Sequence, residues 1–180
     1  MTLNYLSGQN LRLRALEPAD IQLLFEWEND TTIWQVSNTL TPFSRYQLEE
    51  YVLNGNQDLF TVRQLRLMID RTPGQKIETI GTVDLFDFDP YHLRAGVGIM
   101  IQERSRNRGF AREAMQILIR YAFEKLHLHQ LFCNISSDNE ESKGLFTSLG
   151  FSRCGIKKDW INTGKGWDDE WMYQLIDNHE

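Results

Sequence analysis

The segment with the clearest capacity for chemistry is Arg106-Asn107-Arg108-Gly109-Phe110-Ala111, a polar loop that leads into a long, largely apolar helix pattern. The first turn of a helix has unpaired backbone N–H groups and carries the positive end of the helix dipole. A glycine there lets a ligand approach the backbone closely, and the arginines add positive charge. The segment therefore predicts a binding site for a pyrophosphate group. An ordinary polar loop before a helix is the alternative, because short glycine motifs often match by chance.

Two regular elements would position this loop. Residues 94–101 read as a strand that contains Gly96 and Gly98, and glycines within a strand often mark a bulge or the close approach of another backbone. A long helix is expected over about 109–126, and it is apolar around most of its circumference, as in a helix buried on several sides. A strand over 130–135 follows. This strand–helix–strand order predicts a parallel pair with a crossover helix.

The rest of the chain predicts the other layers of one domain over residues 1–180. Apolar or alternating runs between turn signals predict five further strands, over residues 11–15, 65–70, 79–88, 151–160 and 169–175. Three further helices are expected, one after Pro18, one at a Ser44–Gln47 capping box and one at a Ser137–Glu140 capping box. The expected fold class is α/β, with a mixed, mostly antiparallel sheet and helices on both faces.

Composition narrows the functional classes. The 180 residues are 41% hydrophobic and carry a net charge of -6, which fits a globular domain and argues against a nucleic-acid binder. No apolar run approaches the roughly 18 residues of a membrane span, and the N-terminus does not resemble a secretory signal, so we expect a cytoplasmic protein without membrane partners. We expect no metal site, because the histidines do not form a ligand set: they are His92, His127, His129 and His179.

Two motifs resemble those of the GNAT acetyltransferases. Arg106-x-x-Gly109-x-Ala111 is similar to the Gln/Arg-x-x-Gly-x-Gly/Ala signature of that family, and it follows a strand and opens a helix as the family requires. The segment from Asn139 to Phe151 is similar to the family's Asn-x-x-Ser/Ala-x-x-Leu-Tyr-x-x-x-Gly-Phe segment. The resemblance implies the GNAT fold, in which two central strands splay apart, and an acetyl-CoA-dependent N-acetyltransferase.

The end of the chain carries a third likeness. A strand pair joined by Asn162-x-Gly164 and closing on Trp171-Met172 resembles the tails of the ribosomal-protein N-terminal acetyltransferases and of the spermidine/spermine acetyltransferases. Folds of this kind often pair through their last strands, so a homo-oligomer is an open expectation.

The resemblance implies roles for residues along the cofactor. The backbone of Ile99, Met100 and Ile101 would pair with CoA, and amides exposed at a bulge would stabilise the developing oxyanion. Plain strand core is the alternative role for Ile99 and Ile101, and the two roles are compatible. Asn139 would contact the pantetheine arm, with a helix-start position as its alternative. The pyrophosphate would bind the loop amides, those of Arg106, Asn107, Arg108, Gly109, Phe110 and Ala111.

The implied reaction is direct attack of a primary amine on the thioester in a ternary complex. An alkyl ammonium group has a pKa near ~10.4, so the enzyme must remove a proton before attack. Asp84 and Asp87, on the strand beside the cofactor strand, are the candidate bases or water-relay carboxylates, and Asp84 matches an acidic position common in the related polyamine enzymes. An exposed strand carboxylate is the alternative for each.

Two positions depart from the family pattern. The family often has a tyrosine, as general acid for the leaving thiolate, where this chain has Phe146. Phenylalanine cannot donate a proton, which leaves a water, another donor or a weakened enzyme. Gly96 stands where related polyamine enzymes carry an acidic residue that contacts the substrate. These departures keep a second hypothesis open, a catalytically weak acyl-CoA-binding module.

The acceptor hypothesis rests on the first helix and the loop after it. In the related enzymes this region overhangs the acceptor side, and here it combines carboxylates with aromatic side chains: Glu26, Glu28, Asp30, Trp27, Trp34 and Phe43. We take Glu28 and Trp34 as the substrate-binding candidates, because carboxylates and indole faces attract ammonium groups. The acceptor would be a polyamine-like small molecule or a protein N-terminus, with polyamines favoured. The alternative is solvated charges at a helix end and tryptophans in the core.

Overall fold

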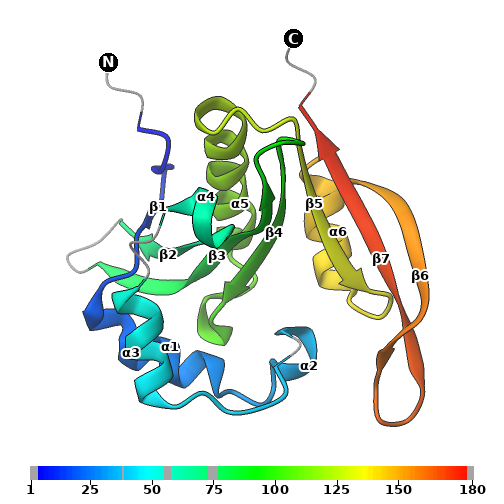
Figure 1. The fold of residues 1–180 in the computed structure, drawn as a ribbon, viewed down its shortest axis with the longest axis horizontal. Helices are drawn as coiled ribbons and strands as arrows, with labels where there is room; N and C mark the ends of the chain where they lie inside the picture. Colours follow the sequence, from blue (N-terminus) through cyan, green and yellow to red (C-terminus); the bar gives the residue numbers. More distant parts are fainter. Residues whose placement is uncertain (1–3, 38, 55–57, 73–76, 178–180) are drawn as a thin grey trace.

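Seven strands form one mixed sheet in the computed structural model, which describes residues 4–37, 39–54, 58–72 and 77–177 (Figure 1). The strand order is β1-β2-β3-β4-β5-β7-β6, and of these neighbours only β4 and β5 run parallel. The mixed, mostly antiparallel sheet predicted from the sequence is confirmed. The strands are β1 (Leu11–Arg14), β2 (Leu65–Arg71), β3 (Glu78–Asp89), β4 (Arg94–Ile101), β5 (Gln130–Ser136), β6 (Ser152–Asn162) and β7 (Trp167–Ile176).

Helices cover both faces of the sheet. On one face, α5 and α6 pack on a large apolar core that includes Val83 and Leu118. On the other face, α1 and α3 enclose a smaller core in which Leu24 and Leu48 pack on Met68 of β2 (Figure 1). None of the helices in the described ranges is long and apolar enough to cross a membrane. The helices are α1 (Ile21–Glu28), α2 (Trp34–Ser37), α3 (Arg45–Leu53), α4 (Leu59–Val62), α5 (Phe110–Arg120) and α6 (Glu140–Ser148).

The central strand pair separates after a short contact. Three residue pairs hold β4 and β5 together, the last of them Gly96 with Phe132. Beyond this pair β4 continues to Ile101 and β5 to Ser136 without a shared register, and the two ribbons diverge (Figure 1). The expected splay of the central strands is therefore present. Each strand keeps its outer neighbour, β3 for β4 and β7 for β5.

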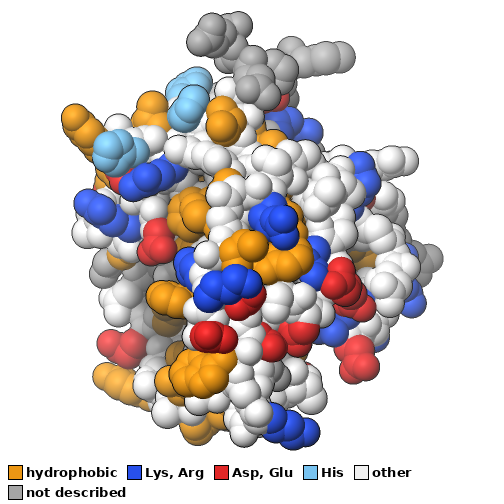
Figure 2. All heavy atoms as spheres, turned by 90° about the vertical axis from the view of Figure 1, so that its right-hand side faces the viewer, with side chains coloured by type: hydrophobic (Ala, Val, Ile, Leu, Met, Phe, Trp, Pro, Cys, Tyr) orange, Lys and Arg blue, Asp and Glu red, His pale blue; other side chains and the backbone are white. Residues whose placement is uncertain are grey.

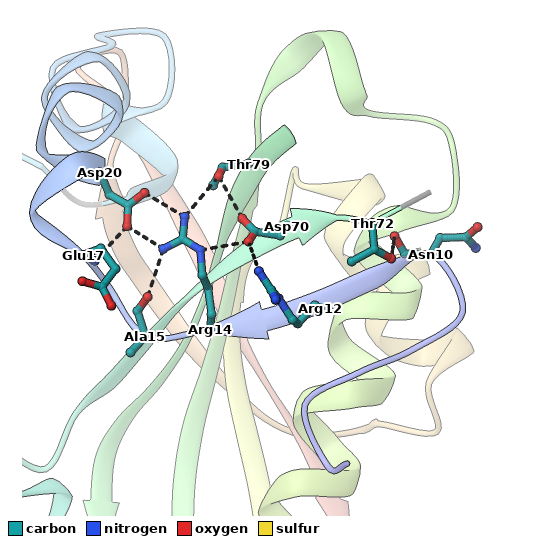
Figure 3. Close-up of polar contacts among 9 residues, drawn as sticks. All are labelled: Asn10, Arg12, Arg14, Ala15, Glu17, Asp20, Asp70, Thr72 and Thr79. Atoms are coloured by element: carbon teal, nitrogen blue, oxygen red, sulfur yellow. Dashed lines mark hydrogen bonds and ion pairs between the residues drawn. The ribbon is translucent and has the colours of Figure 1, made fainter. Parts of the chain in front are cut away.

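Buried charges fasten the segment before α1 to the sheet (Figure 3). Asp70 of β2 is 1% exposed and accepts hydrogen bonds from Arg12 Nη2 at 3.0 Å, Arg14 Nε at 2.9 Å and Thr79 Oγ1 at 2.8 Å. Arg14 also donates to both carboxylate oxygens of Asp20, at 2.6 and 2.8 Å. Asp20 ends a single 3-10 turn that leads directly into α1. The network therefore joins β1, β2 and β3 to the start of α1.

The start of α6 differs from the sequence-based expectation. A Ser137–Glu140 capping box was predicted, but the N-cap is Asn139, whose Oδ1 accepts a hydrogen bond from the Ser142 amide at 3.0 Å. The Ser137 carbonyl instead accepts from Lys143 Nζ at 2.8 Å. Asn is an equally good N-cap residue, so the local pattern offered two adjacent solutions and tertiary packing selected the second. The Ser44–Gln47 capping box of α3 is confirmed.

The buried network predicts a specific pH dependence of stability. Burial raises the pKa of Asp70, but hydrogen bonds from Arg12, Arg14 and Thr79 outweigh it and hold the pKa below its ordinary value. A carboxylate with a lowered folded-state pKa contributes stability above its unfolded pKa of about 3.9, and loses it as the pH falls through the folded-state pKa. Asp70→Asn should lower the free energy of unfolding by about 3 kcal/mol at neutral pH, because it leaves partly buried guanidinium groups without their carboxylate.

Urea unfolding measured from pH 7 to pH 2.5 checks this expectation. The wild type should lose stability below about pH 4, and Asp70→Asn should lose less over the same interval. Glu49→Gln, an exposed carboxylate on α3, is the control and should follow the wild type. Parallel pH profiles for wild type and Asp70→Asn would show that Asp70 does not carry this linkage.

Candidate active site

The separation of β4 from β5 beyond Gly96, called the seam below, exposes one edge of β4. From Val97 to Ile101 the edge that faces β5 has no strand partner in the described sheet, while the other edge pairs with β3. Unpaired N–H and C=O groups along a strand edge can bind another extended chain. Ile99 packs against the large core and Ile101 is 7% exposed, whereas Met100 lies opposite Thr82 on the other face. Core side chains and an available backbone edge therefore coexist at these residues.

The loop between β4 and α5 places helix N–H groups at the wide end of the seam. Gly109 is the N-cap of α5 and has a φ of 79°, in the left-handed region that favours glycine. The Glu113 amide donates to the Gly109 carbonyl at 3.1 Å, which closes the first helical turn. The preceding amides, including those of Phe110 and Ala111, belong to the part of a helix that has no intrahelical acceptor. The geometry fits an anion such as a pyrophosphate.

The side chains around this loop differ in their contacts and exposure. Arg106 Nε donates to the Ile101 carbonyl at 3.0 Å, which fastens the loop to the end of β4. Asn107 takes up a left-handed φ of 58°, and Arg108 is exposed. Phe110 packs against the large core, and the Arg71 guanidinium lies 5.6 Å from its ring centroid. Phe110 is half-buried, and the ligand contact predicted for it is made by its backbone amide.

Asn139 and Phe146, both of the α6 segment, make contacts that stabilise the fold. Asn139 is the N-cap described above, so the helix-start alternative is present; contact with a pantetheine arm remains a prediction. Phe146 is 4% exposed and packs edge-to-face on Phe151, with ring centroids 5.1 Å apart. Its ring belongs to the large core.

A cluster of charged groups lies on the opposite face of the sheet, beneath α1 and α3. Arg66 of β2 donates from Nη1 to Glu28 Oε1 at 2.5 Å and from Nε to Asp84 Oδ1 at 2.7 Å. The Tyr51 ring of α3 lies 5.8 Å from the Arg66 guanidinium carbon. The side chains of Arg66, Glu28 and Asp84 are 20%, 21% and 15% exposed. Two candidate carboxylates predicted separately, one catalytic and one substrate-binding, therefore share a single guanidinium group.

Asp84 lies directly beside the opened strand. It pairs with Gly98 of β4, two residues beyond the last rung that β4 shares with β5. Burial raises the pKa of Asp84, although Arg66 acts against this shift. Asp87, the other candidate base, is exposed, has a φ of 48° and lies in the register break between Phe86 and Asp89. The structure thus distinguishes the two aspartates, and only Asp84 joins the charged cluster.

The carboxylate and aromatic residues predicted to bind the acceptor come together only in part. The Trp34 indole N–H donates to the Glu28 carbonyl at 2.9 Å, which ties α2 to the end of α1. Trp27 packs in the smaller core, as the alternative interpretation held, and Glu26 is exposed. Hydrogen bonds from Thr32 within the turn lower the pKa of the exposed Asp30.

Sequence reasoning missed Arg66 and Tyr51. The hairpin of residues 65–70 and 79–88 was predicted, and its register pairs Arg66 with Asp84. Alternation along β2 places Arg66 on the face opposite Leu67, away from the large core. A charged residue on the inner side of a strand covered by helices was the available signal. Tyr51 gave no such signal, because its contact depends on how α3 packs.

Comparison with known proteins decides the family. Residues 10–152 match the model of the acetyltransferase (GNAT) domain. The chain belongs to the GNAT acetyltransferase family. This GNAT enzyme is 31% identical over 153 residues to an N-acetyltransferase 9-like protein of Nematostella vectensis, covering 82% of the chain and 77% of that protein. It is an N-acetyltransferase, as the resemblance implied.

Spermidine acetyltransferases are among the similar proteins. The spermidine N(1)-acetyltransferase of Vibrio cholerae is 26% identical over 169 residues, covering 93% of this chain and 94% of that protein. A crystal structure of the V. cholerae spermidine N-acetyltransferase in complex with CoA and spermine superposes with a TM-score of 0.82 at 24% identity, covering 94% of this chain and 96% of that one. This likeness confirms the GNAT fold.

The loop geometry predicts how acetyl-CoA binding responds to changes at Gly109. A ligand that binds only the folded state raises the melting temperature, so acetyl-CoA should stabilise the wild type. A Cβ at position 109 would meet nothing within 4 Å, although the φ of 79° strains any side chain, so Gly109→Glu adds a negative charge at the amides predicted to bind the pyrophosphate and should abolish the shift. Gly109→Asn is the matched control, because asparagine tolerates a positive φ and adds no charge. An unchanged shift in Gly109→Glu would place the pyrophosphate elsewhere.

The packing of Phe146 predicts a structural role that kinetics can separate from chemistry. Phe146→Ala should lower the free energy of unfolding by about 3–5 kcal/mol, because it opens a cavity beside Phe151. Phe146→Tyr should raise the acetyl-transfer rate or leave it unchanged. Chemical unfolding and steady-state rates measure the two effects. A folded Phe146→Tyr variant that loses activity would contradict the family analogy at this position.

Proposed function

We propose that this protein transfers the acetyl group of acetyl-CoA to a primary amine on a cationic acceptor, by direct attack within a ternary complex. The acceptor class is a polyamine-like small molecule or a protein N-terminus, with polyamines favoured. The observation that carries the proposal is the position of Asp84. This largely buried carboxylate pairs with Gly98, at a point where β4 no longer pairs with β5. Acetyl-CoA supplies the activated acetyl thioester.

The cofactor side of the proposal uses the backbone. The free edge of β4 at Ile99, Met100 and Ile101 would bind the extended pantetheine arm, and amides there would stabilise negative charge on the thioester oxygen. The loop from Arg106 to Ala111 would hold the pyrophosphate. Its left-handed residues and the N-terminus of α5 support this assignment.

The acceptor side uses the charged cluster. Glu28 and Asp84 share the one positive charge of Arg66, so the three side chains carry a net charge of −1 when all are ionised. An incoming ammonium group would balance that charge. We assign Asp84 to take the proton from the ammonium nitrogen, directly or through a water. Because burial raises its pKa, Asp84 is a stronger base than an exposed aspartate.

A second candidate function is an acyl-CoA-binding module with weak catalysis. The observation in its favour is Phe146, which has no proton to donate and is buried against Phe151. Both candidates bind acetyl-CoA in the same way. They differ in whether free CoA thiol appears when an amine is added.

Self-association is the remaining part of the proposal. β6 is one of the two edge strands of the described sheet, and Figure 2 shows hydrophobic side chains interspersed with charged ones on the side of the molecule that carries β6 and β7. Ile156, Trp160 and Trp167 are 45%, 59% and 61% exposed. A second copy of the chain could cover these side chains. A V. cholerae spermidine N-acetyltransferase has been solved as a dodecamer, which supports a homo-oligomer here.

An acceptor panel with acetyl-CoA, read as release of free thiol, tests the proposed function. Spermidine or peptides with free N-termini should be acetylated, and the rate should fall at high salt because charge attracts the acceptor. Glu28→Gln should reduce kcat/KM further by removing the net negative charge of the cluster. Glu26→Gln, an exposed carboxylate on the same helix, is the matched control and should behave as the wild type.

Asp84→Asn separates chemistry from binding in the same assay. It should lower kcat by about 10²-fold or more, while the thermal shift by acetyl-CoA persists. Strong turnover of a neutral amino sugar or an acidic amino acid, with none on polyamines or peptides, would refute the acceptor assignment. Binding of acetyl-CoA without thiol release on any amine would favour the second candidate.

A further inference from the structure

Five residues next to the seam lie on the face of the sheet that α1 and α3 cover. This face is called the acceptor face, because the proposed acceptor site lies on it. Asp84 and Phe86 are two residues apart on β3 and therefore point to the same face. Their partners across the ladder are Gly98 and Gly96 of β4, and Gly96 pairs in turn with Phe132 of β5. The neighbouring residues of the same strands, such as Leu85 and Val97, belong to the large core on the opposite face.

The Phe86 ring occupies the position of a side chain at residue 96. A Cβ built on Gly96 would lie 2.3, 2.5 and 2.7 Å from three atoms of that ring, closer than real Cβ contacts allow. The ring also meets Phe132 edge-to-face, with centroids 5.9 Å apart. The two aromatic rings therefore bridge β3 and β5 over the last rung of the β4–β5 pair. Any side chain at position 96, including an acidic one, is incompatible with this arrangement.

Gly98, unlike Gly96, has space beside it for further atoms. A Cβ at Gly98 would lie 3.9 Å from Asp84 Cβ and 3.9 Å from Phe86 Cε1, which is ordinary van der Waals contact. The space beside Gly98 is thus bounded by a carboxylate residue on one side and by an aromatic edge on the other. A primary amine placed there would face Asp84 with its nitrogen and Phe86 with its adjoining carbons.

We infer that Phe86, supported by Phe132, determines acceptor specificity, and that the preferred acceptor carries apolar carbons next to its reacting amine with no second positive charge close to it. The inference rests on the proposed function and refines it. Apolar carbons gain from contact with the rings, whereas a second ammonium group at that distance would lose hydration without a carboxylate at position 96 to compensate. Within the polyamines favoured above, the restriction therefore selects the primary amine whose nearest second charge is more distant, which in spermidine is the aminobutyl end and not the aminopropyl end.

A series of amines tests the inference on the whole enzyme with acetyl-CoA. The set comprises linear monoamines from propylamine to octylamine, 2-phenylethylamine and 1,3-diaminopropane, whose charges are close together. The wild type should prefer the longer monoamines and 2-phenylethylamine to 1,3-diaminopropane. Phe86→Ala should lower kcat/KM about tenfold for these apolar amines and change it less than about twofold for 1,3-diaminopropane. The thermal shift by acetyl-CoA should not change.

Two further variants separate specificity from general damage. Phe86→Leu keeps an apolar side chain and should show a smaller loss with the same selectivity, which also serves if Phe86→Ala does not fold. Phe86→Ala combined with Gly96→Asp removes the ring that blocks position 96 and adds a carboxylate, so it should shift the preference towards 1,3-diaminopropane. Tyr91→Ala, which truncates an aromatic residue that is 86% exposed, is the control and should leave the preference unchanged.

The outcomes distinguish this inference from the function on which it rests. An equal loss on all amines in Phe86→Ala and Phe86→Leu, or no loss on any, would overturn the specificity role and leave acetyl transfer intact. A wild-type enzyme that prefers 1,3-diaminopropane to the longer monoamines would do the same. Acetyl-CoA binding without acetylation of any amine would overturn the proposed function and this inference together.

Discussion

The site depends on the early loss of pairing between β4 and β5. Each of these strands is paired along its outer side, β4 with β3 and β5 with β7, whereas the parallel contact between them is the shortest paired stretch of the described sheet. Ending it after Gly96 leaves backbone N–H and C=O groups on β4 that need partners. An extended ligand can supply those partners, and α5 presents its N-terminus at the same end of the strand. The cofactor and acceptor assignments both follow from this opening.

The acceptor face depends on how α1 is fixed to the sheet. Ion pairs hold both ends of the helix: Asp20, just before it, binds Arg14 of β1, and Glu28, its last residue, binds Arg66 of β2. Leu24, between them, is 1% exposed in the smaller core. Two arginines on strands thus fix the helix at both ends, while apolar packing holds its middle. The Glu28–Arg66 contact that positions the end of α1 also places Glu28 and Asp84 on the same guanidinium group.

The features that the sequence predicts well are local. The loop and helix start around Gly109, the Ser44–Gln47 cap and the strand patterns depend on residues a few positions apart, and all are present. Features that depend on register or packing were not predictable in the same way. The Arg66–Asp84 pair requires the register of β2 on β3, and the contact of Phe86 with Gly96 requires that of β3 on β4. The short helices α2 and α4 carry no strong periodic signal, because each is a single turn.

A phenylalanine at position 146 is compatible with acetyl transfer when protons are counted. The acceptor arrives as an ammonium ion with a pKa near ~10.4, whereas a thiol has a pKa near ~8.5 and is a fair leaving group without an acid. Removing the proton from the amine is therefore the more demanding transfer at neutral pH, and it is the one that the proposed function assigns to Asp84. At position 146 the chain instead has an aromatic ring that packs on Phe151 in the core beneath the seam. A missing acid there lowers the rate less than a missing base beside Gly98 would.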